Sequence, residues 1–293
     1  MSALTPGALP TVSRRRRATD VVMRSLLALA TLVALIPLVL VLYYLFHKGL
    51  AAWGGKFFTS DPNGNFLGYA GGIRSAIFGT LEMIGLASVI TIPFGIAVAL
   101  YLTEYGRGSR YANLIRYFID VMTGVPSIVF GLFIYIVLVL GNVGGTGFSA
   151  WKGSIAVGLL MLPIIVRSSE VVLLLVPDSL REAALALGAP RWRVIWKVVL
   201  PTASPGLLTG SLLAIARGAG ETAPLLFTAV GAQVLTGSLT GQMNALPLQI
   251  YYDIQSPRDQ IVTRAWGAAL TLVLLILALN LIARITSRRS RLA

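Results

Sequence analysis

Six stretches of the chain are apolar at nearly every position, and they restrict the fold more than any other feature. A helix that crosses the hydrocarbon core of a bilayer, about 30 Å thick, needs about 20 such residues. The apolar residues run continuously and do not alternate with polar ones, so helices fit better than the strands of a membrane barrel. We therefore predict an all-α polytopic membrane protein with six transmembrane helices, at 21–46, 77–102, 114–140, 154–176, 205–230 and 265–285.

The composition supports a membrane protein and excludes several other classes. Only 12% of the 293 residues are charged and the mean hydropathy is +0.81, whereas a soluble domain carries about 25% charged residues. The chain has no cysteine and a single histidine, His47, so thiolate and multi-histidine metal sites are excluded and we expect no bound metal. In a membrane protein, the net charge of +13 predicts basic loops that contact anionic lipid headgroups, and no nucleic-acid partner.

The distribution of basic residues predicts the orientation. Of the 24 lysines and arginines, 17 flank the spans on one side and 6 on the other, which predicts that both termini are cytoplasmic. We interpret 21–46 as a signal anchor, because a cleavable signal peptide has a much shorter apolar segment. The expected organisation is a disordered basic tail at 1–20, a first span at 21–46, an external loop at 47–72, a main membrane domain at 73–286, and a second basic tail at 287–293.

The polar segment 177–204, between the fourth and fifth spans, predicts a cytosolic pair of helices. Asp178 and Ser179 are suited to cap a helix that continues to Leu187, and Gly188 suits a left-handed stop. A second helix at 190–200 is expected to end at Pro201 and Pro205. One predicted face carries Ala183, Ala184, Leu187 and Trp192, and the other Arg181, Arg191, Arg193 and Lys197. The pattern fits either an amphipathic hairpin on the lipid surface or a knob for a cytosolic partner.

The fifth apolar run contains two charged residues four positions apart, Arg217 and Glu221. A charge at the centre of a bilayer costs about 2.5–3.5 kcal/mol on insertion scales. The pair is either a structural lock between helices or part of a polar substrate path. A guanidinium matches two oxygens of a tetrahedral oxyanion, which favours the path. Hydroxyls are available to such a path from Ser211 and Thr222, and helix bends or a gate are expected at Gly218, Gly220 and Pro224.

Charges in the other spans leave alternatives open. Glu82 either faces the path or pairs with Arg74. Arg167 and Glu170, three residues apart, are expected to pair on a helix surface. Asp120 is expected to pair with a basic loop residue, and Pro126 predicts a further bend or gate.

The cytosolic segment also carries a sequence resemblance. Glu182, Ala183 and Ala184, then Gly188, then Leu200 and Pro201 stand at spacings that resemble the EAA loop of bacterial ATP-binding-cassette (ABC) importer permeases. The resemblance implies the type I importer fold, with 73–286 as the transmembrane type-1 domain and 177–204 as a coupling loop. In that family the loop docks into a groove of the ATPase subunit.

Four further stretches resemble the A-type permease subunit of phosphate-specific ABC transporters: 93–105, 121–133, 216–229 and 279–285. This resemblance implies a bacterial plasma-membrane location and a heterodimer with a C-type permease subunit. It further implies an ATPase dimer that binds ATP and Mg, a periplasmic or lipid-anchored phosphate-binding protein, and a role in phosphate passage for Arg217 and Glu221.

The chain has no sequence motif for catalysis or nucleotide binding, such as a Walker motif, a nucleophile elbow or HExxH. We therefore expect a transport subunit without an ATPase site or a cofactor of its own. The alternatives are a permease for molybdate or sulfate, a membrane-embedded enzyme, and a channel that works without an ATPase.

Overall fold

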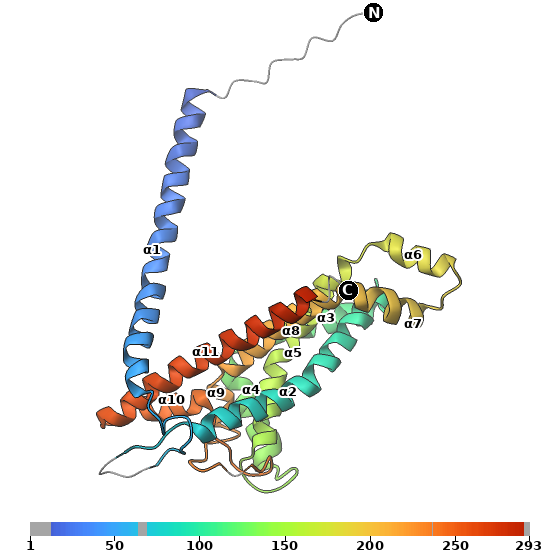
Figure 1. The fold of residues 1–293 in the computed structure, drawn as a ribbon. Coiled ribbons are helices and arrows are strands. Elements are labelled where there is room, and N and C mark those ends of the chain that lie inside the picture. The colour runs from blue at the N-terminus through green and yellow to red at the C-terminus, as the bar shows by residue number, and fades with distance from the viewer. Residues whose placement is uncertain (1–12, 64–68, 236, 290–293) are drawn as a thin grey trace, which may run out of the picture. The chain divides into compact units, whose positions relative to one another are not determined.

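A computed structural model describes residues 13–63, 69–235 and 237–289, which are mostly helical (Figure 1). The described residues form two compact units, divided between His47 and Lys48. In chain order the helices are α1 (Arg14–Ala52), α2 (Arg74–Leu100), the π-helix η1 (Tyr101–Tyr105), α3 (Arg110–Gly124), α4 (Ser127–Ile134), the π-helix η2 (Tyr135–Leu140), α5 (Ala150–Leu174), α6 (Asp178–Ala186), α7 (Arg191–Val194), the π-helix η3 (Ile195–Val199), α8 (Leu200–Ala219), α9 (Ala223–Leu226), α10 (Leu246–Ile254) and α11 (Asp259–Arg289).

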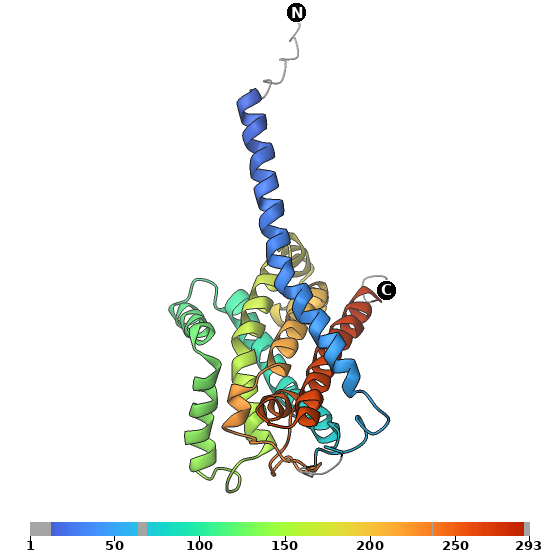
Figure 2. The same cartoon turned by 90° about the vertical axis from the view of Figure 1, so that its left-hand side faces the viewer.

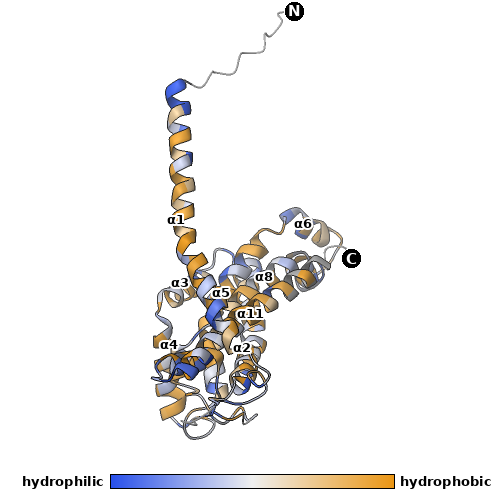
Figure 3. Cartoon of the chain, turned by 60° about the vertical axis from the view of Figure 1, so that its left-hand side comes forward, coloured by the Kyte–Doolittle hydropathy of each residue, from blue (hydrophilic) through white to orange (hydrophobic). Residues whose placement is uncertain are grey.

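Five helical segments within the described residues are long and apolar enough to cross a membrane. The first is α1, which is hydrophobic along most of its length and hydrophilic in its first turns (Figure 3). The bent pair α3 and α4–η2 gives a sixth if it counts as one span. The five are Arg14–Ala52, Arg74–Tyr105, Ala150–Leu174, Arg191–Ala219 and Asp259–Leu281.

The core of the second unit is formed by α2, α5 and α8, which pack side by side, with α11 against α8 (Figures 1 and 2). A stripe of small residues at every fourth position of α8 makes the close approach to α5 possible: Gly206, Gly210, Ala214 and Gly218. A Cβ added at Gly210 would lie 2.3 Å from Ser168 Oγ, and one at Gly206 would lie 2.5 Å from Val172 Cγ1. Small residues at this spacing are a common helix-packing device in membranes, and our sequence analysis did not identify it.

The two ends of the second unit differ in structure. The hairpin of α6 and α7 lies at one end, whereas the described loop residues 53–63, 69–73, 141–149, 227–235 and 237–245 lie at the other (Figure 1). The loop end is held by a buried ion pair that the sequence analysis missed. Arg264 donates to both carboxylate oxygens of Asp253 at 2.7 Å, and also to the carbonyl oxygen of Ala70. Gln249 donates to Asp253 at 2.7 Å, so the carboxylate has three donors.

The predicted third span, 114–140, is not one straight helix. Helix α3 ends at Gly124, and the segment that begins at Ser127 is bent by 104° from it. Val125 has an extended backbone with ψ of 130°, as expected for a residue before proline. The bend predicted at Pro126 is therefore present, and it is large enough to separate two helices.

The predicted second helix of the cytosolic pair does not end at Pro201 and Pro205. It continues from Arg191 through η3 into α8 and ends at Ala219. Pro205 has no N–H for the carbonyl oxygen of Pro201, and the hydroxyl of Ser204 donates to that oxygen instead, at 2.9 Å. The free carbonyl is thereby satisfied locally, which lets the helix pass through Pro205.

The predicted fifth span, 205–230, is wrong in its second half. Helix α8 ends at Ala219, and only the short α9 follows before a loop. Gly218 packs against Val157 and Met161, seven and eleven residues into α5. At 1.5 Å per residue these positions lie about 10–16 Å from the start of α5, so α8 ends inside the bundle and not at its edge.

The predicted tails differ in part from the structure. Helix α1 begins at Arg14, so residues 14–20 are helical where we expected disorder. Arginine is a good helix former, and Asp20 pairs with Arg24 one turn later, at 2.9 Å. At the other end α11 continues to Arg289. The rest of the two tails, 1–12 and 290–293, lies outside the described residues.

A pH-dependent contact joins the segment between α1 and α2 to the start of α2. Arg74 donates to both carboxylate oxygens of Asp61, at 3.1 and 2.7 Å, and these bonds hold the pKa of the Asp61 carboxyl below its ordinary value of 3.8. A lowered folded-state pKa stabilises the fold above the unfolded pKa, and this contribution is lost as pH falls through the folded pKa. We expect Asp61→Asn to lower the melting temperature in detergent at pH 7 and to have a shrinking effect below about pH 4. A pH-independent difference from the wild type would contradict this assignment.

Candidate functional site

The interrupted end of α8 carries the two charged residues of the fifth apolar run. Arg217 lies in the last turn of α8, and Glu221 follows the C-cap residue Gly220. Arg217 Nη2 lies 2.9 Å from Glu221 Oε1. The contact lacks the alignment of a hydrogen bond, so Oε1 is buried without one. The pair is therefore an ion contact across a helix end, and not the predicted pair on one continuous helix face.

The two members of this pair differ in exposure. The side chain of Arg217 is 60% exposed, whereas that of Glu221 is 7% exposed. A guanidinium in an apolar segment is costly in lipid and is found facing water, a cavity or a protein partner. Because Arg217 contacts Glu221 on one side and most of its side chain is exposed, the guanidinium is accessible to an anion.

The other residues predicted for the path do not all gather at this pair. Thr222 follows Glu221 directly and is half-buried. Ser211 is buried, and its hydroxyl donates to the carbonyl oxygen of Leu207 at 2.8 Å, so it faces the packed core. Glu82 is half-buried on α2, and Arg74 pairs with Asp61 and not with Glu82. No ion pair or hydrogen bond of the Glu82 side chain occurs within the described part of the chain.

The four residues predicted as bends or a gate lie at three different places. Pro126 is at the 104° bend between α3 and α4. Gly218 and Gly220 are at the end of α8, where Gly218 is packed against α5 and a Cβ added at Gly220 would meet only the carbonyl oxygen of Arg217, at 3.8 Å. Pro224 is buried in α9, and a Cβ on Gly131 of α4 would lie 2.7 Å from its Cα. The last three therefore belong to the helix interruption, and Pro224 connects it to α4.

The α6–α7 hairpin presents an apolar tip to the surroundings. Gly188 has φ of +80° and nothing within 4 Å of an added Cβ, as predicted for a left-handed stop after the first helix. The neighbouring Leu187 is 90% exposed, and Trp192 is 56% exposed. Of the residues that carry the EAA pattern, Glu182, Ala183, Gly188 and Pro201 are exposed, and Ala184 and Leu200 are half-buried. An exposed apolar tip of this kind indicates a binding surface.

The predicted cap of α6 is absent. Pro177 is the N-cap residue and makes no side-chain cap bond. Asp178 lies in the first turn, where its carboxylate accepts a hydrogen bond from Arg181 at 3.0 Å. A carboxylate in the first turn still interacts favourably with the helix dipole.

Arg181, predicted for the exposed basic face, is in fact buried, with a side chain only 9% exposed. Its Nε and Nη2 donate to Glu104 Oε1 at 3.2 and 2.9 Å. The same guanidinium donates to the carbonyl oxygens of Leu173 and Val176 at the end of α5. A fully bonded fork is the form in which arginine tolerates burial. The pattern of one apolar and one basic face placed Arg181 on the surface, because it does not show partners that lie far away in sequence.

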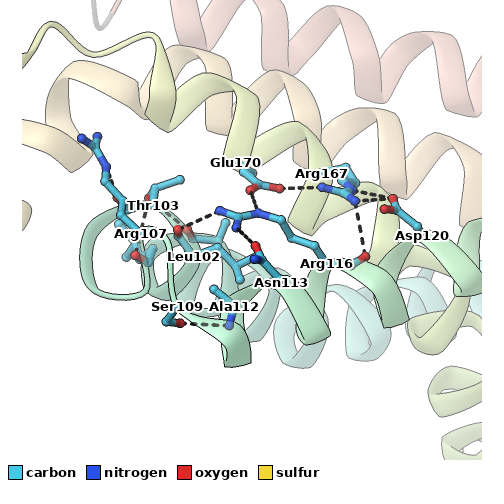
Figure 4. A network of polar contacts seen from close by, with 12 residues as sticks. Leu102, Thr103, Arg107, Ser109, Ala112, Asn113, Arg116, Asp120, Arg167 and Glu170 are labelled. Carbon is cyan, nitrogen blue, oxygen red and sulfur yellow. Dashed lines mark hydrogen bonds and ion pairs between the residues drawn. The ribbon is translucent and has the colours of Figure 1, made fainter.

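A polar network joins α3 to α5 next to this contact (Figure 4). Arg116 donates to Glu170 at 2.6 Å and to the carbonyl oxygen of Leu102 at 3.0 Å. Arg167 donates to Glu170 at 2.8 Å and to Asp120 at 3.0 Å. The predicted Arg167–Glu170 pair is therefore present. Asp120 also pairs with a basic residue, although that residue lies in a helix and not in a loop.

A hollow of about 480 Å³ next to the hairpin is lined by charged residues of both signs. It lies between α6, α7 and the end of α2. Its charged lining residues are Glu104, Arg107, Asp178, Arg181, Glu182 and Arg191.

Comparison with known proteins gives consistent matches. Residues 91–292 match the family described as the inner membrane component of binding-protein-dependent transport systems. The phosphate transport system permease protein PstA 1 of Mycobacterium tuberculosis is 40% identical over 287 residues, covering 95% of this chain and 92% of that protein. The PstA protein of Yersinia pestis is 43% identical over 261 residues, covering 88% and 87%.

A solved structure supports the fold. A chain of a bacterial alginate ABC transporter, solved in complex with an alginate-bound periplasmic protein, superimposes with a TM-score of 0.64, 17% identity and coverage of 93% of this chain and 96% of that chain.

Proposed function

The chain belongs to the PstA permeases, within the inner membrane components of binding-protein-dependent transport systems, and we propose that it forms one permease half of an ATP-driven phosphate importer. The supporting observation is the identity of 40–43% to two PstA proteins over 88–95% of this chain. In geometric terms, Arg217 offers an open guanidinium at a helix interruption inside the bundle. Interrupted helices near the membrane midplane commonly form the substrate sites of transporters.

The proposed partners are a C-type permease subunit, an ATPase dimer that binds ATP and Mg, and a phosphate-binding protein outside the membrane. The apolar tip at Leu187 is the proposed contact to the ATPase. The proposed orientation places this hairpin and both termini on the cytoplasmic side of a bacterial plasma membrane. The bias of 17 basic residues against 6 supports this orientation.

In this proposal Arg217 contacts phosphate only transiently. The contact between Arg217 and Glu221 crosses the end of α8 and lacks hydrogen-bond alignment. Such a contact can loosen when an anion arrives and form again when it leaves. ATP hydrolysis in the partner subunits would move the two permease halves between outward-facing and inward-facing forms.

The function is tested by uptake into proteoliposomes that contain the four proposed components. We expect ATP-dependent phosphate uptake that excess molybdate or sulfate does not compete away. Competition by either anion would indicate the other-oxyanion permease, and uptake without ATP or ATPase would indicate a channel. Absence of uptake in a fully assembled complex would contradict the proposal.

Substitutions at the hairpin test its docking role. Glu182→Lys and Gly188→Asp should leave membrane insertion intact but reduce capture of the ATPase by at least about tenfold. Aspartate is strained at φ of +80° and adds a charge to the apolar tip. The measurement is pull-down of the purified ATPase.

Gly237→Asp is the matched control for Gly188→Asp. Gly237 also has a positive φ, +59°, and open space around it, but it lies in the 227–245 loop at the opposite end. It should not alter ATPase capture. Full capture by both hairpin variants would favour the lipid-surface hairpin instead.

A further inference from the structure

The π-helix η1, which directly continues α2, accepts hydrogen bonds from three arginines of three separate segments. Within η1, the carbonyl oxygen of Leu102 accepts from Arg116, and that of Thr103 accepts from Arg107 at 2.6 Å. The next residue, Glu104, accepts from Arg181. Three successive residues of one π-turn thus meet α3, the following loop and α6 (Figure 4 for the first two). Single π-turns of this kind are frequent at functional sites.

Among these contacts, the one between Arg181 and Glu104 connects the hairpin to the membrane helices. Helix α6 packs against α7 and η3, so most of its contacts stay within the hairpin. Arg181 reaches beyond the hairpin, with hydrogen bonds to Glu104 at the end of α2 and to Leu173 and Val176 at the end of α5. The Arg181 side chain is buried and that of Glu104 is only 12% exposed, so solvent screens the contact little.

A second contact between the hairpin and the end of α2 is weaker. Arg107 lies 3.6 Å from Asp178, and both side chains are more than half exposed. Exposed pairs of this kind contribute little. Of these two ionic contacts, the Arg181–Glu104 pair is therefore the stronger. It acts beside the continuous helix from α7 into α8 and the apolar packing of Ala184.

We propose that the Arg181–Glu104 pair is the positioning contact that transmits displacement of α6 to α2 and α5. This inference rests on the proposed function, in which the ATPase moves the hairpin. From α5 the movement can reach the helix interruption, because Gly218 of α8 is packed directly on Met161 and Val157. A continuous series of packed contacts thus joins the hairpin to Gly218, the residue directly after Arg217.

The first test measures the link in this chain alone. The sequence has no cysteine, so spin labels at Leu187→Cys and Val89→Cys, both exposed positions in α6–α7 and α2, report one distance. Glu104→Gln should broaden the distance distribution measured by pulsed electron paramagnetic resonance. Glu104→Asp keeps the charge and shortens the reach, so it should broaden the distribution less.

Asp61→Asn is the matched control. Arg74 binds Asp61 through the same two nitrogens, Nε and Nη2, but at the opposite end of the molecule. With the same two spin labels, the distance distribution of Asp61→Asn should equal that of the labelled chain without this substitution. An unchanged distribution in both Glu104 variants would overturn the proposal, whether or not the chain imports phosphate.

The second test uses the assembled importer. Glu104→Gln should lower phosphate imported per ATP hydrolysed by about tenfold, while capture of the ATPase equals that of the Asp61→Asn complex. A purely structural role would lower capture, hydrolysis and import together, and that result would overturn the proposal. Failure of the unsubstituted complex to import phosphate would contradict the proposed function, and the distance measurement would still decide the link.

Discussion

Replacing Arg217 by glutamine should reduce ATP-driven phosphate uptake by roughly 10- to 100-fold. A hydrogen bond to a charged group contributes about 1.5–3 kcal/mol, and glutamine keeps a neutral donor but loses the charge and the two-pronged fork. The guanidinium is 60% exposed at the end of α8, so it is available to an anion in a way that the buried Glu221 is not. The measurement is initial uptake rate in proteoliposomes at matched amounts of assembled complex.

Two further variants separate charge from geometry at this position. Arg217→Lys keeps the charge and loses the fork, so its uptake should lie between those of the wild type and Arg217→Gln. Arg110→Gln removes an exposed arginine at the first residue of α3, away from the helix interruption, and should leave uptake unchanged. Normal uptake by Arg217→Gln in a correctly assembled complex would remove Arg217 from the phosphate path.

The apolar runs and the glycine at the hairpin were readable from the sequence because each reflects a local requirement. A run of about 20 apolar residues needs only a bilayer to make it a helix, and Gly188 needs only its own positive φ. The second, fourth and sixth spans and the hairpin turn at Gly188 were therefore predicted close to where the structure has them, whereas the third and fifth spans were not.

The continuation of α8 through Pro201 and Pro205 could not be predicted in this way. The sequence shows the two missing N–H groups, but the structure shows the Ser204 hydroxyl bound to the freed carbonyl oxygen. Proline breaks a helix when that carbonyl has no donor, and a serine directly before Pro205 was the available signal.

The buried charges depended on long-range contacts. Arg181 and Glu104 are 77 residues apart, and Arg116 and Glu170 are 54 apart. An amphipathic pattern assigns charged residues to a solvated face, so it placed Arg181 on the surface. Only the packing of α2, α5 and α6 brings its partners within reach. Asp253 and Arg264 are only 11 residues apart, but they lie in two different helices, α10 and α11, so no pattern within one helix indicated their pair.

A large loss of stability is expected at Glu170, the carboxylate that two arginines share (Figure 4). Its side chain is 8% exposed, with Arg116 and Arg167 on its two oxygens. Glu170→Gln leaves both guanidinium groups without their shared counter-charge, and removing one partner of a buried ion pair typically costs about 3–5 kcal/mol.

Asp120→Asn is the control, because it removes a carboxylate from the same network at a side chain that is 60% exposed. An exposed pair contributes less than about 1 kcal/mol, so this variant should melt close to the wild type in detergent, whereas Glu170→Gln should melt far below it. Equal melting temperatures for the two variants would mean that α3 is held to α5 by apolar packing around Ile119 and Val166. In that case the network would act on the orientation of α3 and not on the stability of the fold.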